Sequence, residues 1–204
     1  MKGKIFLIVI FASLFVVLQV IRCEAGAAMD LVRALLEEVM TIQTDPQLQG
    51  QELRNTRRTA IKKIIVRNFY FESMAKEALG PYWEERSGLE RAEFKAIFQD
   101  LFQDSYSRLV LDFLGREKIL YTKEDIGQDQ AMVKTTILRV NEEIPVDYFL
   151  MSVEGKWLVH DVKIDGVSIV ENYKKSFSRV IKQESYESLL RKMRLQQQTI
   201  EKPS

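Results

Sequence analysis

Residue types that commonly carry metal or thiol chemistry are scarce in this chain of 204 residues, which has one cysteine and one histidine. The cysteine, Cys23, lies in an apolar N-terminal segment, so the rest of the chain can form neither disulfides nor cysteine metal sites. The histidine, His160, sits beside Asp161 in a predicted strand. Adjacent side chains of a strand point to opposite faces, so the two form an orienting pair only if a bulge intervenes. Zinc-protease, phosphate-loop and calcium-loop motifs are absent as well, and the sequence predicts no metal site and no cofactor.

A large excess of charge of one sign is also missing. The chain has 30 Lys and Arg residues against 29 Asp and Glu residues, a formal net charge of +1. Removing residues 1–27 takes away three cations and one anion and changes this net charge to −1. Proteins that bind nucleic acid through surface charge have a basic patch or a strongly positive domain. The composition therefore predicts no nucleic-acid partner.

The N-terminus has the pattern of an export signal. Lys2 and Lys4 precede an apolar run over residues 5–21, and Ala-Gly-Ala at residues 25–27 is a small-residue cleavage pattern. We therefore expect residues 1–27 to be a cleaved signal peptide. The apolar run is long for a signal core and just short of a membrane-spanning helix, so an uncleaved membrane anchor is the alternative.

Apolar residues at spacings of three and four predict several helices in the rest of the chain. Two of these helices have a capping-box start, in which a serine caps the first turn and a glutamate three positions later reaches back. The boxes are Ser87 with Glu90 and Ser168 with Glu171. The predicted helical segments are residues 29–44, 48–69, 87–114, 168–177 and 185–198.

Two helix faces leave alternatives open. The segment 48–69 is rich in Arg and Lys, which predicts a solvated face or, alternatively, contact with an anionic membrane. The segment 87–114 carries an apolar stripe that is either packed core or in part the wall of a cavity. The stripe consists of Phe94, Ile97, Phe98, Leu101, Phe102, Tyr106, Leu109 and Phe113.

Four segments between these helices are rich in β-branched and aromatic residues and are joined by short turns, which predicts an antiparallel meander. In the last of them Trp157 and Val159 have odd numbers, whereas Val162 and Ile164 have even numbers. Either both faces of this strand are covered or a bulge lies near Asp161. Strands and helices together indicate an α+β protein. The predicted strands are residues 118–122, 131–140, 144–153 and 157–164.

Three stretches of the chain resemble the toluene-tolerance, or MlaC, family. They are FYFESMAKEALGPYW, EFKAIFQDLFQDSY in the long helix, and IPVDYFLMSVEGKWLVHDVKIDGVSIVENYKKSF, and together they follow the family's order over nearly the whole chain after the signal. The chain departs from the family at Tyr70, where an acidic residue is usual, and at Gly88, where proline is usual. Members are exported phospholipid-binding carriers that serve an ABC transport system maintaining outer-membrane lipid asymmetry.

The resemblance implies an α+β fold with a small curved antiparallel sheet of about four strands, around which N-terminal, central and C-terminal helices enclose an apolar lipid pocket. Residues 28–198 would form one lipid-binding domain, followed by a flexible tail over residues 199–204. The implied protein is a soluble periplasmic carrier without catalytic residues. Its implied partners are a phospholipid ligand, an inner-membrane ABC transporter complex and an outer-membrane lipid donor or acceptor complex. The residues expected to line the pocket are Phe71, Met74, Leu79, Trp83, Phe98, Leu101, Phe102, Tyr148, Leu150, Trp157, Val162, Ile164 and Val167.

Two other classes of function remain open from the sequence. The first is a small-substrate enzyme in a cone-shaped α+β fold, which would need a buried carboxylate of raised pKa, with Asp147 and Asp161 as the candidates. The second is a membrane-anchored interaction protein, which would need residues 1–27 to stay attached.

Overall fold

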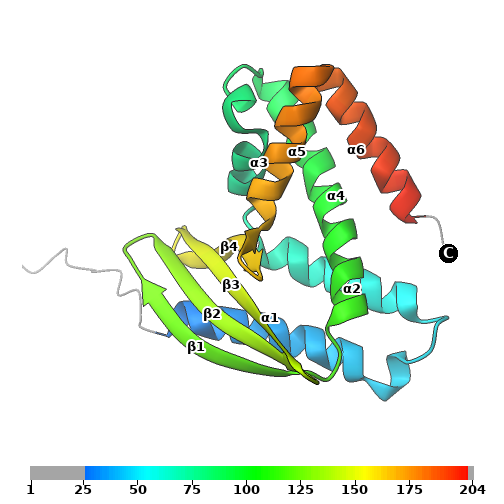
Figure 1. Ribbon diagram of the computed structural model, residues 1–204, viewed down its shortest axis with the longest axis vertical. Helices are drawn as coiled ribbons and strands as arrows, with labels where there is room; N and C mark the ends of the chain where they lie inside the picture. The colour runs from blue at the N-terminus through cyan, green and yellow to red at the C-terminus, as the bar shows by residue number, and fades with distance from the viewer. Residues whose placement is uncertain (1–25, 202–204) are drawn as a thin grey trace, which may run out of the picture.

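The chain is arranged in blocks: helices first, then a sheet, then two further helices. The computed structural model describes residues 26–201, so residues 1–25 of the predicted signal lie outside the described part. The α+β class is confirmed (Figure 1). The elements are α1 (Ala27–Thr44), η1 (Pro46–Leu48), α2 (Arg54–Asn68), α3 (Phe71–Leu79), η2 (Gly80–Trp83), α4 (Gly88–Phe113), β1 (Lys118–Ile126), β2 (Gln130–Arg139), β3 (Glu142–Val153), β4 (Lys156–Ile164), β5 (Val167–Ser168), α5 (Ile169–Gln183) and α6 (Tyr186–Glu201).

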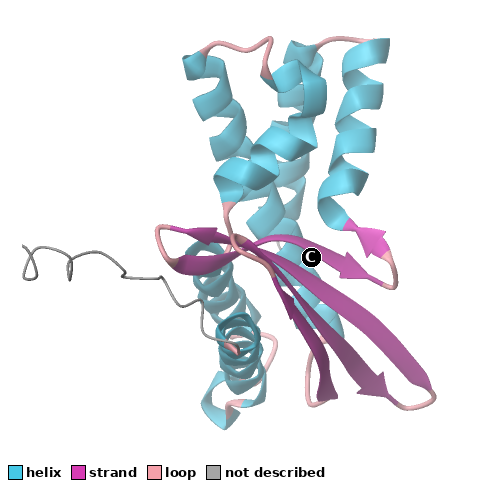
Figure 2. Ribbon diagram, turned by 90° about the vertical axis from the view of Figure 1, so that its left-hand side faces the viewer, coloured by secondary structure: helices cyan, strands magenta, loops and turns pink. Residues whose placement is uncertain are grey.

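The sheet is an open antiparallel meander in the order β1-β2-β3-β4-β5, as the short connections predict. It has five strands where about four were expected, because the two-residue β5 adds to the edge of β4 directly after the turn at residues 165–166. The strands twist strongly across the sheet, which Figure 2 shows.

Of the two alternatives for this strand, the bulge near Asp161 is the one observed. Phe149 pairs with Asp161 and Leu150 pairs with Val159, so His160 is an extra residue without a partner on β3. This extra residue changes the alternation of β4, and Val159 and Val162 therefore lie on the same face of the sheet. The face that carries Val146, Tyr148 and Leu150 of β3 thus continues unbroken across β4.

Helices occupy two regions, and α4 is part of both. In one region α3, α5, α6 and the N-terminal half of α4 form a helical bundle; in the other α1 and α2 lie against one face of the sheet (Figures 1 and 2). The 26-residue α4 runs from the bundle to the sheet (Figure 1). Its two halves consequently have different surroundings, which decides the role of the aromatic stripe.

Aromatic rings fill the interior of the bundle. Phe98 contacts the rings of Phe94, Phe102, Tyr173 and Phe177, with centroids 5.4 to 6.3 Å apart. The edge-to-face contacts with Tyr173 and Phe177 join α4 to α5. The N-terminal half of the stripe is therefore packed core, the first of the two predicted alternatives.

The serine caps lie where the sequence predicts them. Ser87 and Glu90 form the complete capping box at the start of α4. At the start of α5 the Ser168 hydroxyl accepts from the amide of Glu171 at 3.0 Å, while the Glu171 carboxylate faces Lys174 and Lys175 at 3.6 and 3.8 Å. The second predicted capping box is therefore only half formed: Ser168 caps α5, but no hydrogen bond from the Ser168 amide to Glu171 is found among the described residues.

Two helix limits differ from the predicted ones. The segment predicted as a helix from residue 48 becomes an α-helix only at Arg54. Gly50 adopts φ 98°, a left-handed conformation that interrupts the helix after η1. At the other end of the chain α6 continues to Glu201, into the segment expected to be a tail. Residues 202–204 lie outside the described part.

Candidate functional site

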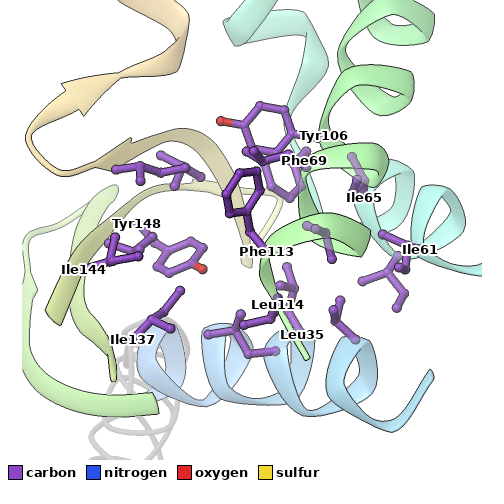
Figure 3. A pocket seen from close by; sticks show the side chains of 18 of the residues that line it. Leu35, Ile61, Ile65, Phe69, Tyr106, Phe113, Leu114, Ile137, Ile144 and Tyr148 are labelled. Atoms are coloured by element: carbon purple, nitrogen blue, oxygen red, sulfur yellow. The ribbon is translucent and has the colours of Figure 1, made fainter. Parts of the chain in front are cut away.

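A cavity of about 350 Å³ lies between the sheet, α1, α2 and the C-terminal half of α4 (Figure 3). Cavities that bind small ligands commonly measure about 300 to 1,000 Å³. The strands contribute the face that the bulge keeps continuous, and α1 closes the opposite side. The position of α1 is fixed at its start, where the carboxylate of Glu124 on β1 accepts hydrogen bonds from the amides of Gly26 and Met29 at 2.8 and 2.7 Å.

The lining is almost entirely apolar. Of the nineteen lining residues, sixteen are aliphatic or phenylalanine, two are tyrosines and one is an arginine. Such a surface offers burial but few directional contacts, so it suits hydrocarbon much better than a polar metabolite. The lining residues are Leu35, Leu36, Val39, Ile61, Ile64, Ile65, Phe69, Tyr106, Leu109, Val110, Phe113, Leu114, Ile137, Arg139, Ile144, Val146, Tyr148, Val162 and Ile164.

The cavity reaches the surface on the α4 side. The lining residues of α1 and α2 are buried, whereas Ile137, Ile144 and Ile164 on the strands are only half-buried. Phe113, near the end of α4, is 53% exposed and still lines the cavity. The entrance therefore lies where the end of α4 meets the ends of the strands.

The polar groups of the interior wall are the hydroxyls of two tyrosines. The hydroxyl of Tyr148 points into the cavity from the central strand β3 (Figure 3). The hydroxyl of Tyr106 is shielded from solvent and has no hydrogen-bond partner among the described residues. Burial raises the pKa of both phenols above the ordinary value, so both are neutral at physiological pH. The cavity wall thus holds no carboxylate among the described residues, and its one cation is Arg139 at the entrance.

The structure brings three of the thirteen residues predicted to line a pocket into the cavity: Tyr148, Val162 and Ile164. Val167 lies in β5 and is 61% exposed. The other nine are buried in the interior and are not part of the cavity wall. They are Phe71, Met74, Leu79, Trp83, Phe98, Leu101, Phe102, Leu150 and Trp157.

Most of the cavity wall was not singled out from the sequence. Leu35 on α1 and Ile61 on α2 belong to the apolar spacing that predicts these two helices, and that spacing gives no reason to assign them to a pocket. Tyr106, Leu109 and Phe113 were recognised only as the end of the stripe on α4. For that half of the stripe, the second alternative, a cavity wall, is the one observed.

The two carboxylates needed by an acid-base enzyme are engaged elsewhere. Asp161 accepts hydrogen bonds from the hydroxyl of Ser168 at 2.5 Å and from the amide of Val170 at 3.1 Å, and so fixes the start of α5. The Asp147 carboxylate lies 3.6 Å from the ammonium of Lys134, on the sheet face opposite the cavity. Neither carboxylate is placed to act on a molecule in the cavity.

His160 lies outside the cavity wall as well. Its Nδ1 is shielded from solvent and has no hydrogen-bond partner in the described part of the chain, and burial lowers the pKa of the imidazole below its ordinary value. Residues 26–201 contain no cluster of three or more His, Cys, Asp or Glu side chains arranged to hold a metal ion. Nor does any helix in this range have the length and apolarity needed to cross a membrane.

An α+β protein whose helices and sheet enclose an open apolar cavity belongs to the class of proteins suited to binding hydrocarbon. The family model described as MlaC protein matches residues 33–195. The chain is therefore a member of the MlaC family, which confirms the resemblance found in the sequence.

Two relatives share the family's fold or role at low sequence identity. The intermembrane phospholipid transport system binding protein MlaC of Haemophilus influenzae is 21% identical over 144 residues, which are 68% of this chain and 67% of the relative. A solved structure, the phospholipid-binding protein from Ralstonia solanacearum in complex with a phospholipid, matches with a TM-score of 0.74 at 21% identity. That match covers 86% of this chain and 99% of the other and supports the fold described above.

Proposed function

We propose that this protein is an exported carrier that binds phospholipid acyl chains in the cavity and shuttles lipid between membranes. The observation that carries the proposal is the apolar wall of the cavity, which holds one charged residue in nineteen. Membership of the MlaC family and the phospholipid-binding roles of the two relatives support it further.

The energetics of moving a lipid through water fit a carrier of this design. Two acyl chains of about sixteen carbons each are worth roughly 25 kcal/mol in gross transfer free energy, at ~0.8 kcal/mol per methylene. A carrier must therefore shield nearly all of both tails, while the headgroup can remain in water. Apolar contact is non-directional, so we expect the cavity to select hydrocarbon and to accept a range of headgroups.

The size of the cavity limits how much lipid it holds in this state. An engineered cavity of about 150 Å³ accommodates benzene, so a cavity of about 350 Å³ has room for roughly fourteen carbon atoms. One acyl chain fills it. Binding a second chain requires the walls to move apart, and the entrance between Phe113 and the strand ends is the side with the least buried wall.

The proposed location is the periplasm, reached through a signal peptide over residues 1–27 that is then removed. The proposed partners are an inner-membrane ABC transporter complex and an outer-membrane complex that donates or accepts lipid. N-terminal sequencing of the exported protein tests the cleavage, since a start near Ala28 excludes a retained anchor.

Lipid extraction provides the direct test of the function. The protein is purified without detergent, extracted with organic solvent, and the extract is analysed by mass spectrometry. We expect about one phospholipid per folded protein, or uptake from phospholipid vesicles when the purified protein is empty. Folded protein that carries no lipid and takes none from vesicles would contradict the proposal.

A further inference from the structure

Arg139, the last residue of β2, is the one charged side chain in the cavity wall. It also borders a shallow hollow on the outer surface, so it stands at the boundary between the apolar interior and solvent. The charged residues around this outer hollow are Arg116, Glu117, Lys118, Arg139 and Glu142, which together carry a formal charge of +1.

The guanidinium of Arg139 is held at the entrance by contacts with the end of α4. Its Nη2 donates a hydrogen bond to the carbonyl of Phe113, and the group lies over the Phe113 ring, 5.4 Å from the ring centroid. The same ring lines the cavity and is more than half exposed. Arg139 is thus fixed beside the residue that marks the opening.

The hydrogen-bonding capacity of Arg139 is not used up by these contacts. Its Nε is shielded from solvent and has no hydrogen-bond partner within residues 26–201, where a carboxylate oxygen of Glu117 lies 3.6 Å away. A guanidinium has five N–H donors in a planar fork, which matches two oxygens of a phosphate. The carbonyls at the end of α4 have a further donor in Gln43, whose side-chain amide reaches Leu114 and Val110. Arg139 therefore does not have to use all of its N–H donors to cap this helix.

We infer that Arg139 binds the phosphate of the lipid headgroup at the entrance of the cavity. This inference rests on the proposed function, because a tail in the cavity places the headgroup at the opening. The phosphate would take the place of Glu117 beside Nε, and Arg116 and Lys118 supply positive charge around it. Arg139 then separates lipids with a phosphate from neutral lipids with the same tails.

A competition between two lipids tests this role. The purified protein is incubated with vesicles that contain dioleoylphosphatidylcholine and dioleoylglycerol in equal amounts, then re-isolated, and its bound lipids are quantified by mass spectrometry. The two lipids have identical tails, and the zwitterionic headgroup presents a phosphate without charging the vesicle surface. The ratio of bound phospholipid to bound diacylglycerol therefore reports the phosphate contact.

Arg139→Gln should lower this ratio about tenfold, the loss expected for a charge-assisted hydrogen bond, with no loss of bound diacylglycerol, because both lipids compete for the same cavity. Arg179→Gln, an equal change of charge on the exposed face of α5, should leave the ratio as it is. Glu117→Gln should raise the ratio, because it removes the competing carboxylate. Glu117→Gln therefore tests the phosphate contact of Arg139 even if Arg139→Gln does not fold.

The outcomes separate this inference from the function on which it rests. Equal loss of both lipids in Arg139→Gln would show that the residue only holds the entrance together, and an unchanged ratio would show that it makes no phosphate contact. Either result overturns the inference, as does a Glu117→Gln variant whose ratio does not rise. Wild-type protein that takes up neither lipid would instead overturn the carrier function itself.

Discussion

The carboxylate of Asp161 accepts a hydrogen bond of 2.5 Å from the hydroxyl of Ser168, and this contact fastens the start of α5 to β4. The same carboxylate accepts from the buried amide of Val170 at 3.1 Å. Ser168 is the N-cap of α5 and Val170 lies in its first turn, so one strand side chain binds both the capping residue and a free amide of the helix start. The role of Asp161 is therefore structural, and its removal has a predictable cost.

Replacing Asp161 with alanine should lower the free energy of unfolding by about 1 to 3 kcal/mol, because the Val170 amide is left buried without an acceptor. Asp147→Ala is the matched control, since it removes a partly exposed carboxylate from the other sheet face and should cost about 0 to 1 kcal/mol. Urea unfolding of both variants measures the difference. Equal costs would show that the contacts of Asp161 contribute no more than a surface ion pair.

A cavity wall and a packed core respond differently to a larger side chain. Val162→Trp places its ring in the cavity, so we expect little loss of stability together with loss of bound lipid. Leu101→Trp enlarges a residue that is 1% exposed and does not line the cavity, and should cost about 1 to 3 kcal/mol. Lipid content and thermal midpoint, measured side by side, check both. A Val162→Trp protein that unfolds as readily as Leu101→Trp would show that the cavity has no spare room.

A buried and an exposed ion pair both join α2 to α4, and the buried one should contribute more to stability. Asp104 is buried and contacts both Arg58, at 2.9 Å, and Lys62. Asp104→Ala leaves these two cations without their carboxylate and should lower the free energy of unfolding by about 3 to 5 kcal/mol.

Asp112 provides the control for this prediction, because its ion pair with Arg54 joins the same two helices at the surface. Asp112→Ala should cost about 0 to 1 kcal/mol in the same denaturant titration. A cost for Asp104→Ala no larger than that for Asp112→Ala would mean that water enters the α2–α4 contact freely.

His160 should titrate below the ordinary histidine pKa, because burial disfavours the charged imidazole more than Glu77 and Asp161 favour it. The unfolded chain then binds more protons than the folded one as pH falls below about 6.5, so stability should decrease from there until the folded pKa is passed. It is the one histidine of the chain, so its NMR titration gives the pKa directly. A value at or above about 6.5 would contradict the prediction, and His160→Gln should remove this part of the pH dependence.

Features that depend on nearby residues could be predicted from the sequence. The capping box of Ser87 and Glu90 follows from two side chains three positions apart, and the structure confirms it. The pattern of apolar residues in β4 left a bulge near Asp161 as one of two alternatives, and the structure has the bulge. The meander follows from short turns in the same way.

The cavity could not be predicted because periodicity shows only that a helix face turns inward. Phe98 and Phe113 belong to one stripe on α4, yet Phe98 contacts the rings of α5 while Phe113 lines a void. The difference arises because the bundle covers one half of α4 and the sheet faces the other. The basic face of α2 shows the same limit, since the partner of Arg58 and Lys62 is a carboxylate more than forty positions away in the chain.

The extra residue in β4 also determines where this strand can change in length during evolution. Deleting His160 would leave a regular strand in which Val159, Val162 and Ile164 still share a face, so relatives can lose one residue here and keep the same wall. An insertion after Val162 would instead turn Ile164 outward and bring a polar neighbour toward hydrocarbon. Gaps in an alignment of this strand should therefore gather at the bulge and be rare beyond it.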